Sequence, residues 1–140
     1  MKGIRIILFA AVMLMLSNIA SAAQIPYHFI TIDEYLKSAD SVQMVDVRSV
    51  QSRHRSGMEV AKEIWIDPYK KAPLDKFIAG QDKNKAYVVF CSCSDDGYSI
   101  RAAQIMSQNG FKNVSVLKDG SAVVKAKLLP MIKIKGDAKK

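Results

Sequence analysis

The sequence predicts an α/β domain with a central, mostly parallel sheet and helices on both faces. The 140 residues are enough for one domain with its own hydrophobic core. Segments rich in β-branched residues alternate with segments of helical periodicity, which is the order found in parallel, helix-covered sheets. The run Tyr87–Phe90 is apolar throughout, as is typical of a strand buried on both faces.

The first 22 residues have the three parts of a secretory signal peptide. A basic start precedes an apolar core, Ile6–Leu16, that is too short to span a bilayer permanently. The small residues Ala20-Ser21-Ala22 form a cleavage site, which disfavours the alternative of an uncleaved anchor, and no cysteine follows for lipid attachment. We expect a mature chain from Ala23, periplasmic or otherwise exported, that meets the membrane only during export.

The first half of the mature chain begins with a helix. Thr31 and Glu34 form a capping box that opens a helix through about Lys37. A polar segment, residues 49–57, separates two runs that we expect to be strands. These runs are Val42–Val47 and Ile64–Ile66.

The second half alternates in the same way. A helix is expected from Pro73, a residue suited to a first helical turn, to about Gly80. After the strand Tyr87–Phe90, helical spacing runs over Ser99–Asn109 and ends at an Asn-Gly pair. The last expected elements are a strand at Val114–Leu117 and a helix at Ser121–Leu129, stopped by Pro130. We expect one domain over residues 23–130 and a basic tail over 131–140.

The charge balance is basic without the pattern of a nucleic-acid-binding protein. The chain has 21 Lys and Arg residues against 13 Asp and Glu residues, a net charge of +8. Removal of Lys2 and Arg5 with the signal peptide leaves +6. Neither interleaved aromatic residues nor a DNA-reading helix accompanies the excess, so we expect a solvated basic surface and no nucleic-acid partner. We expect a monomer.

The only two cysteines, Cys91 and Cys93, are separated by one residue. A disulfide between them would close a very small loop and remove little entropy from the unfolded chain, so a structural staple is not expected. If the pair oxidises, oxidation would reflect reactivity. Two thiolates are too few for a closed zinc site, and we expect neither a resident metal nor a cofactor.

The cysteines lie where a buried strand passes into a helix. Ligands of open α/β sheets bind at this end of the strands. The N–H groups and the positive dipole end of the helix expected from Ser99 favour a thiolate, and small loop residues can turn backbone N–H groups toward an anion. The plain alternative is a turn with half-buried cysteines. The candidate binding loop is Ser92, Ser94, Asp95, Asp96, Gly97, Tyr98 and Ser99.

Four motifs, in order, resemble a known family. They are VDVRS (45–49), VVFC (88–91), SIRAAQIMSQNGFKNVSVL (99–117) and KDGSAVVKAKLLP (118–130). Over about residues 27–130 the chain resembles a single-domain rhodanese, a sulfurtransferase. The resemblance implies a rhodanese-like α/β fold and double displacement through a cysteine persulfide. The implied partners are a small sulfur donor (thiosulfate, polysulfide or persulfide) and a thiol acceptor.

The loop departs from the family pattern in length. Counting forward along the strand makes Cys91 the nucleophile, whereas counting six steps back from Ser99 selects Cys93. Both cysteines therefore remain catalytic candidates, and strand position favours Cys91.

The loop is also acidic. Asp95 and Asp96 would raise a thiol pKa and repel an anion, and the loop lacks the arginine-rich cradle of a phosphatase. Arg101 follows in the helix as a candidate supporting residue. Asp46 and Arg48 are further supports, because the resemblance implies that the DVR segment braces neighbouring loops.

Two other functions compete with sulfur transfer. The C-x-C pair suits a dithiol redox protein, or a Cu(I)-handling protein whose partner supplies further ligands. A catalytically silent rhodanese fold would serve as a binding module.

Overall fold

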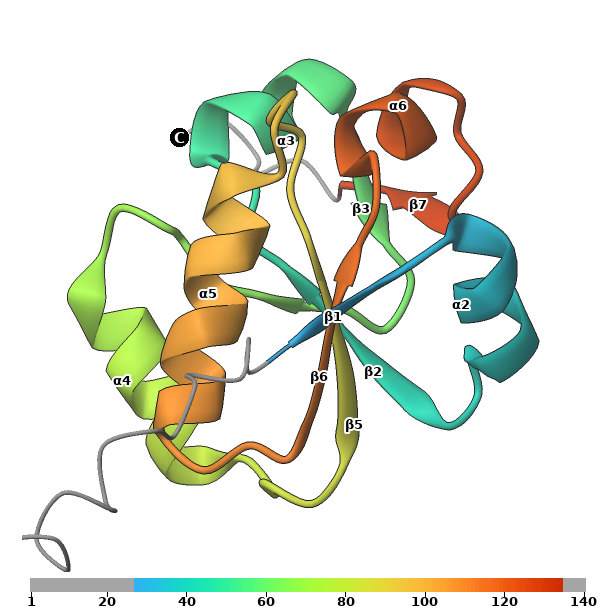
Figure 1. The fold of residues 1–140 in the computed structure, drawn as a ribbon. Helices are drawn as coiled ribbons and strands as arrows, with labels where there is room; N and C mark the ends of the chain where they lie inside the picture. Colours follow the sequence, from blue (N-terminus) through green and yellow to red (C-terminus); the bar gives the residue numbers. More distant parts are fainter. Residues whose placement is uncertain (1–26, 135–140) are drawn as a thin grey trace, which may run out of the picture.

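The computed structural model describes residues 27–134 as an α/β domain built on a parallel sheet (Figure 1). The sheet has five strands in the order β1-β6-β5-β2-β4, all paired in parallel, which confirms the predicted fold class. The expected signal peptide and the end of the expected tail lie outside the described residues. The strands are β1 (His28–Ile30), β2 (Val42–Asp46), β4 (Ile64–Trp65), β5 (Ala86–Phe90) and β6 (Asn113–Leu117).

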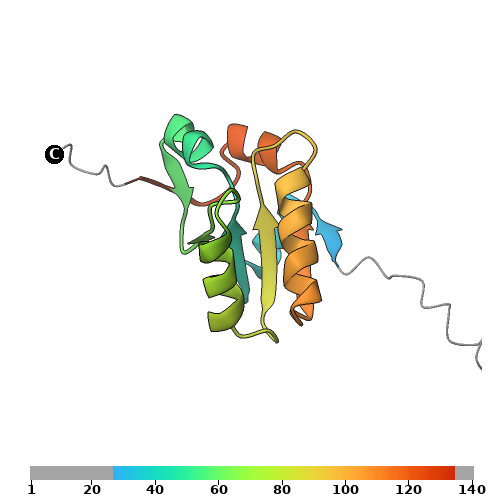
Figure 2. The same cartoon turned by 90° about the vertical axis from the view of Figure 1, so that its left-hand side faces the viewer.

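Two hydrophobic clusters cover the two faces of the sheet. On one face, Val45, Tyr87 and Val89 pack with residues of α4 (Lys71–Gly80) and α5 (Gly97–Gln108). On the other, Met44 and Val88 pack with residues of α2 (Ile32–Ser38) and α6 (Gly120–Lys125). Alternation along β2 and β5 sends successive side chains to opposite faces. Figure 2 shows α4 and α5 side by side over one face.

Local sequence signals explain several element boundaries. Thr31 caps α2, and both hydrogen bonds of the predicted capping box with Glu34 are present. Asn109 is the C-cap of α5, and Gly110 follows with φ +90°.

The structure adds one helix and moves several expected helix boundaries. Helix α4 begins at Lys71, two residues before the expected Pro73. Residues 49–57, expected only as a polar segment, contain α3 (Val50–Ser56), capped by Ser49 and ended by Gly57 at φ 62°. Helix α5 begins at Gly97, two residues before the expected start, and α6 ends at Lys125 instead of Leu129.

A small second sheet pairs β3 (Met58–Val60) with β7 (Met131–Lys133) in antiparallel fashion. Strand β7 follows Pro130, so the first residues of the expected tail belong to the folded part of the chain. Among the described residues, no helix is both long and apolar enough to cross a membrane.

Candidate functional site

The candidate site lies at the carboxyl edge of the main sheet. There the N–H of Val47 donates to the carbonyl of Phe90 at 2.9 Å, and the N–H of Ile66 donates to the carbonyl of Asp46 at 2.9 Å. These hydrogen bonds align the carboxyl ends of β5, β2 and β4 at the same edge of the sheet. The loops that follow the three strands therefore leave the sheet side by side, and α3 and α6 lie at the same edge (Figure 1).

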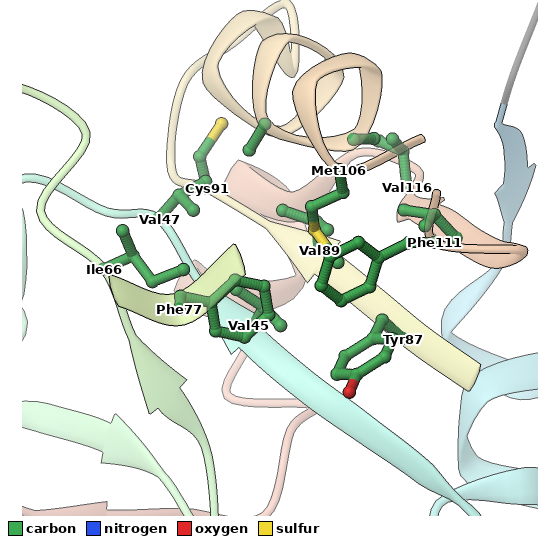
Figure 3. Packing of buried hydrophobic residues seen from close by; sticks show 13 residues of the cluster. Val45, Val47, Ile66, Phe77, Tyr87, Val89, Cys91, Met106, Phe111 and Val116 are labelled. Carbon is green, nitrogen blue, oxygen red and sulfur yellow. The ribbon is translucent and has the colours of Figure 1, made fainter. Parts of the chain in front are cut away.

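Cys91 directly follows β5 and belongs to the cluster under α4 and α5. It lies at the loop end of that cluster, next to Val47, and Tyr87 lies at the other end (Figure 3). Its residue is 1% exposed, whereas Cys93 is half-buried. The two cysteines are joined by a disulfide with a Cα–Cα distance of 5.6 Å. The bond spans one intervening residue and ties no separate elements together, as expected of a reactive pair and not of a staple.

Asp96 faces away from its own helix. It is the N-cap of α5, with φ 53°, but it makes no side-chain cap hydrogen bond. Its buried carboxylate instead accepts from the N–H of Asp119 at 2.9 Å and the N–H of Gly120 at 3.1 Å. Asp96 therefore does not cap its own helix, and the N–H of Gly97 at the start of α5 donates to the neighbouring carboxylate of Asp95.

Asp95, the other loop carboxylate, is exposed and accepts from the N–H of Gly97 at 3.1 Å. The expectation that both acidic residues act on the substrate side needs correction for Asp96. This residue is a brace between the loop and the start of α6. Asp95 alone remains as an exposed negative charge in the loop.

Gly120 lets α6 approach the cysteine backbone. A Cβ atom at this position would lie 2.6 Å from the carbonyl oxygen of Cys91, inside van der Waals contact. With the two bonds to Asp96, this close approach fixes the carbonyl end of β5 against the closing turn. The glycine of the DG turn is therefore required by packing.

Ser99 supplies a hydroxyl without a partner. The residue is fully buried, and its Oγ makes no hydrogen bond within the described residues. It lies in the first turn of α5, among the buried residues Ala102, Ala103 and Met106 of this helix. A buried hydroxyl that is unpaired in a native fold is a candidate for binding a ligand.

The rest of the candidate loop contacts neighbouring elements. The hydroxyl of Ser92 lies in short hydrogen-bond contact with that of Ser52 in α3, and Ser94 is exposed. Tyr98 donates its hydroxyl to that of Tyr69 at 2.5 Å, and this bond to Tyr69 raises the pKa of Tyr98. Neither Ser52 nor Tyr69 could be singled out from the sequence, because both contacts join distant segments.

Asp46 and Arg48 form a fully buried ion pair. Arg48 Nη2 lies 2.9 Å from Asp46 Oδ2, and its Nη2 also donates to the carbonyl of Met58 at 3.0 Å. Arg53 of α3 joins the pair, with its Nε 3.1 Å from Asp46 Oδ2 and its Nη2 2.5 Å from Glu63 Oε1. The network braces the loop after β2 against α3 and β3.

Sequence reasoning missed two members of this network, Arg53 and Glu63. The signals that would have found Arg53 are Ser49 and Gly57, an N-cap residue and a C-terminal glycine at helical separation. Burial, with a contribution from Asp46, raises the pKa of Glu63 to about 7, against the opposing effects of the Val60 N–H and Arg53.

A groove of about 820 Å³ lies between α4 and α5, beside the cysteine loop. Apolar side chains such as Leu74, Ile78 and Ile105 line it, and Tyr98 and Arg101 contribute from α5. Arg101 is exposed and lines this groove, whereas neither cysteine does. Arg101 therefore lies beside the loop and not inside it.

Within residues 27–134 no cluster of three or more His, Cys, Asp or Glu side chains could hold a metal ion. The arrangement offers a disulfide-bonded sulfur pair in the loop that leads into the N-terminus of α5. This chemistry is that of thiolate nucleophiles and thiol–disulfide exchange.

Comparison with known protein families gives a match to one family model. The model of the rhodanese-like domain matches residues 31–127. A search of curated proteins found no match.

Solved structures share the fold at low sequence identity. The rhodanese-like domain of an Anabaena protein is 17% identical with a TM-score of 0.61, and the match covers 80% of this chain and 86% of that one. A rhodanese-related protein from Thermoplasma volcanium is 20% identical (TM-score 0.56), with coverage of 76% and 98%. A protein of unknown function from Rhodopseudomonas palustris, described as a possible tyrosine phosphatase, is 19% identical (TM-score 0.60), with coverage of 76% and 85%. At these identities the likeness concerns the fold.

Proposed function

Because the chain belongs to the rhodanese-like domain family, we propose that it is a sulfurtransferase that carries sulfane sulfur on Cys91. The observation that carries the proposal is the position of Cys91. It follows a strand buried on both faces and precedes α5, whose N-cap residue Asp96 makes no side-chain cap hydrogen bond. Cys93, two residues on, is the second sulfur of the same loop.

The first step of the proposed reaction needs a reduced pair. An external thiol attacks the disulfide, and the half-buried Cys93 is its more accessible sulfur. A second thiol then attacks the resulting mixed disulfide, the external disulfide leaves, and both cysteines are reduced. The freed Cys91 thiolate then attacks the outer sulfur of thiosulfate. The S–S bond of the donor breaks, sulfite leaves with the bonding electrons, and Cys91 becomes a persulfide.

Three groups of the loop support a negatively charged sulfur at this point. The N–H of Cys93 donates to Cys91 Sγ at 3.4 Å. We propose that the unpaired hydroxyl of Ser99 and the first-turn N–H groups of α5 that follow Gly97, whose own N–H is bonded to Asp95, add further donors. The persulfide then gives its outer sulfur to an acceptor thiolate, and Cys91 leaves as a thiolate.

The exposed carboxylate of Asp95 opposes a dianionic donor such as thiosulfate. The loop also has no arginine between Cys91 and Ser99. We therefore propose that a neutral donor or an organic persulfide is a better donor than thiosulfate, and that phosphate esters are not substrates.

The test is mass spectrometry of reduced protein after incubation with thiosulfate, polysulfide or an organic persulfide. The expected first product, seen early in wild type and persistently in Cys93→Ser, is an adduct of about 32 Da, one sulfur atom, that a reductant removes. Cys91→Ser should abolish it, whereas Cys93→Ser should retain it. Absence of the adduct in Cys93→Ser with all three donors would show that Cys91 is not a sulfur carrier.

We also propose export, on the ground of the amino-terminal sequence. An oxidising compartment would keep the Cys91–Cys93 pair as a disulfide between turnovers. Fractionation of cells that produce the full chain, with the mass of the mature protein, tests this. Recovery of an unprocessed chain in the cytoplasm would contradict it.

The disulfide itself favours a second candidate function, a dithiol redox protein. The reduced pair would pass two electrons to a partner disulfide, or hold Cu(I) with ligands from a partner. Cu(I) titration against a competing chelator, with Cys93→Ser as the comparison, separates this function from sulfur transfer. A protein that shows no adduct, no copper binding and no reduction of a disulfide substrate would be a binding module.

A further inference from the structure

We infer that Cys93 discharges the persulfide formed on Cys91, so that the protein releases sulfide and closes its own disulfide. This inference rests on the proposed function, because it begins from the Cys91 persulfide. It adds a second activity, the reduction of sulfane sulfur to sulfide, to the transfer of sulfur to an acceptor.

The disulfide shows that the two sulfur atoms reach bonding distance within the native fold. The backbone on both sides of the pair is anchored. Before it, Cys91 ends β5 and its carbonyl lies against Gly120, and after it Asp96 is bonded to the closing turn. Attack by Cys93 on Cys91 therefore needs only local adjustment of the C-x-C segment. Such an internal reaction has a large advantage over attack by a dissolved thiol.

Burial strengthens this advantage. Cys91 is 1% exposed, so a bulky external thiol has restricted access to its sulfur. Cys93 is half-buried, packs against the same hydrophobic cluster and already lies next to Cys91. The internal thiol thus reaches the Cys91 sulfur without entering from solvent.

The step balances without an added oxidant. The Cys93 thiolate attacks Sγ of the Cys91 persulfide, the bond between Sγ and the outer sulfur breaks, and hydrosulfide leaves with the electron pair. The two cysteine sulfurs are oxidised to the disulfide, and the sulfane sulfur is reduced to sulfide. A proton from the Cys93 thiol or from solvent accompanies the hydrosulfide. Return to the dithiol requires an external dithiol reductant, as in ordinary thiol–disulfide exchange.

The experiment uses full-length protein that is reduced, freed of reductant and kept anaerobic. Thiosulfate with an isotopically labelled outer sulfur is the first donor, and cysteine persulfide, labelled at its outer sulfur, is the second. Labelled sulfide and intact protein mass are measured over time in wild type and Cys93→Ser. Cys91→Ser is the matched control, which retains the other thiol of the loop and should give neither adduct nor sulfide.

Wild type should release about one equivalent of labelled sulfide per chain and end about 2 Da lighter, as the disulfide. Cys93→Ser should keep the adduct of about 32 Da and lose it at least about 100-fold more slowly. Cys93→Ala, which lacks a hydroxyl, should behave in the same way.

Other results would overturn the inference. A wild-type adduct as persistent as that of Cys93→Ser would exclude discharge by Cys93 while leaving sulfur transfer intact. If neither protein takes up label from either donor, and no sulfide forms, the proposed function fails and discharge fails with it.

Discussion

The substitution Gly120→Ala tests the packing of the closing turn against the cysteine loop. The new Cβ would lie 2.6 Å from the carbonyl oxygen of Cys91 and 3.4 Å from Asp96 Oδ1. The first neighbour is backbone at the end of a central strand, so it cannot move aside cheaply. The closing turn must therefore shift, which also stretches the hydrogen bond from the Gly120 N–H to Asp96.

The magnitude follows from three contributions. Overpacking of a rigid site costs about 1–3 kcal/mol. A weakened hydrogen bond to a charged acceptor costs about 1 kcal/mol more. Replacement of a helical glycine by alanine returns up to about 1 kcal/mol. We expect the free energy of unfolding to fall by about 1–3 kcal/mol.

The matched control is Gly80→Ala at the end of α4, where an added Cβ meets no atom within 4 Å. This change should be neutral or stabilising by up to about 1 kcal/mol. Urea unfolding of the oxidised proteins, followed by far-UV circular dichroism, measures both. With an m-value of about 1–3 kcal/mol/M, a loss of 2 kcal/mol lowers the midpoint by roughly 1 M. A Gly120→Ala midpoint equal to wild type would refute the argument that α6 is locked against Cys91.

Three further predictions concern the loop and the ion-pair network. Asp96→Ala should cost about 2–4 kcal/mol in urea unfolding, because two backbone N–H groups lose a carboxylate partner. The exposed Asp95→Ala should cost less than about 0.5 kcal/mol, and equal losses would contradict the different roles of the two residues. Ser99→Ala should stabilise the fold by about 1 kcal/mol, because it removes an unpaired buried hydroxyl. The same change should slow formation of the persulfide adduct. An unchanged rate of adduct formation would exclude the hydroxyl from the site. Burial raises the pKa of Glu63 to about 7 from 4.5, so the folded state binds its proton more tightly than the unfolded state. The associated stability, roughly 1–3 kcal/mol, is present below pH 4.5 and is lost as the pH rises through 7. Urea midpoints of wild type measured between pH 4.5 and 8 should therefore decline, and Glu63→Gln should remove this decline. A wild-type curve without the decline would contradict the prediction.

Features encoded by neighbouring residues could be predicted from the sequence. The capping box of Thr31 and Glu34 acts within one helical turn, and the apolar run before Cys91 indicates a strand buried on both faces. The alternation of such segments is enough to predict a parallel sheet with helices on both faces. The position of the cysteines at the end of a strand follows from the same local order.

The ends of helices were harder to predict from the sequence where the local signals were weak or conflicting. The polar segment after Arg48 contains helix α3, whose own residues carry no buried side chain. Its only sequence signals are the cap residues Ser49 and Gly57. The helix expected to reach Leu129 ends at Lys125, because the chain turns there to bring Leu129 into the core.

By itself, the sequence determined the fold class, the alternation of the central strands with helices and the placement of a C-x-C pair between a buried strand and a helix, because these depend on short-range periodicity and capping. Helix α3 and the short strands β1, β3 and β7 were not predicted. Only the tertiary structure decided what the loop around the pair does. Asp96 bonds to a turn 23 residues away, and Gly120 is packed against Cys91. Such contacts join segments distant along the chain, and nothing in the local pattern of either segment specifies the other.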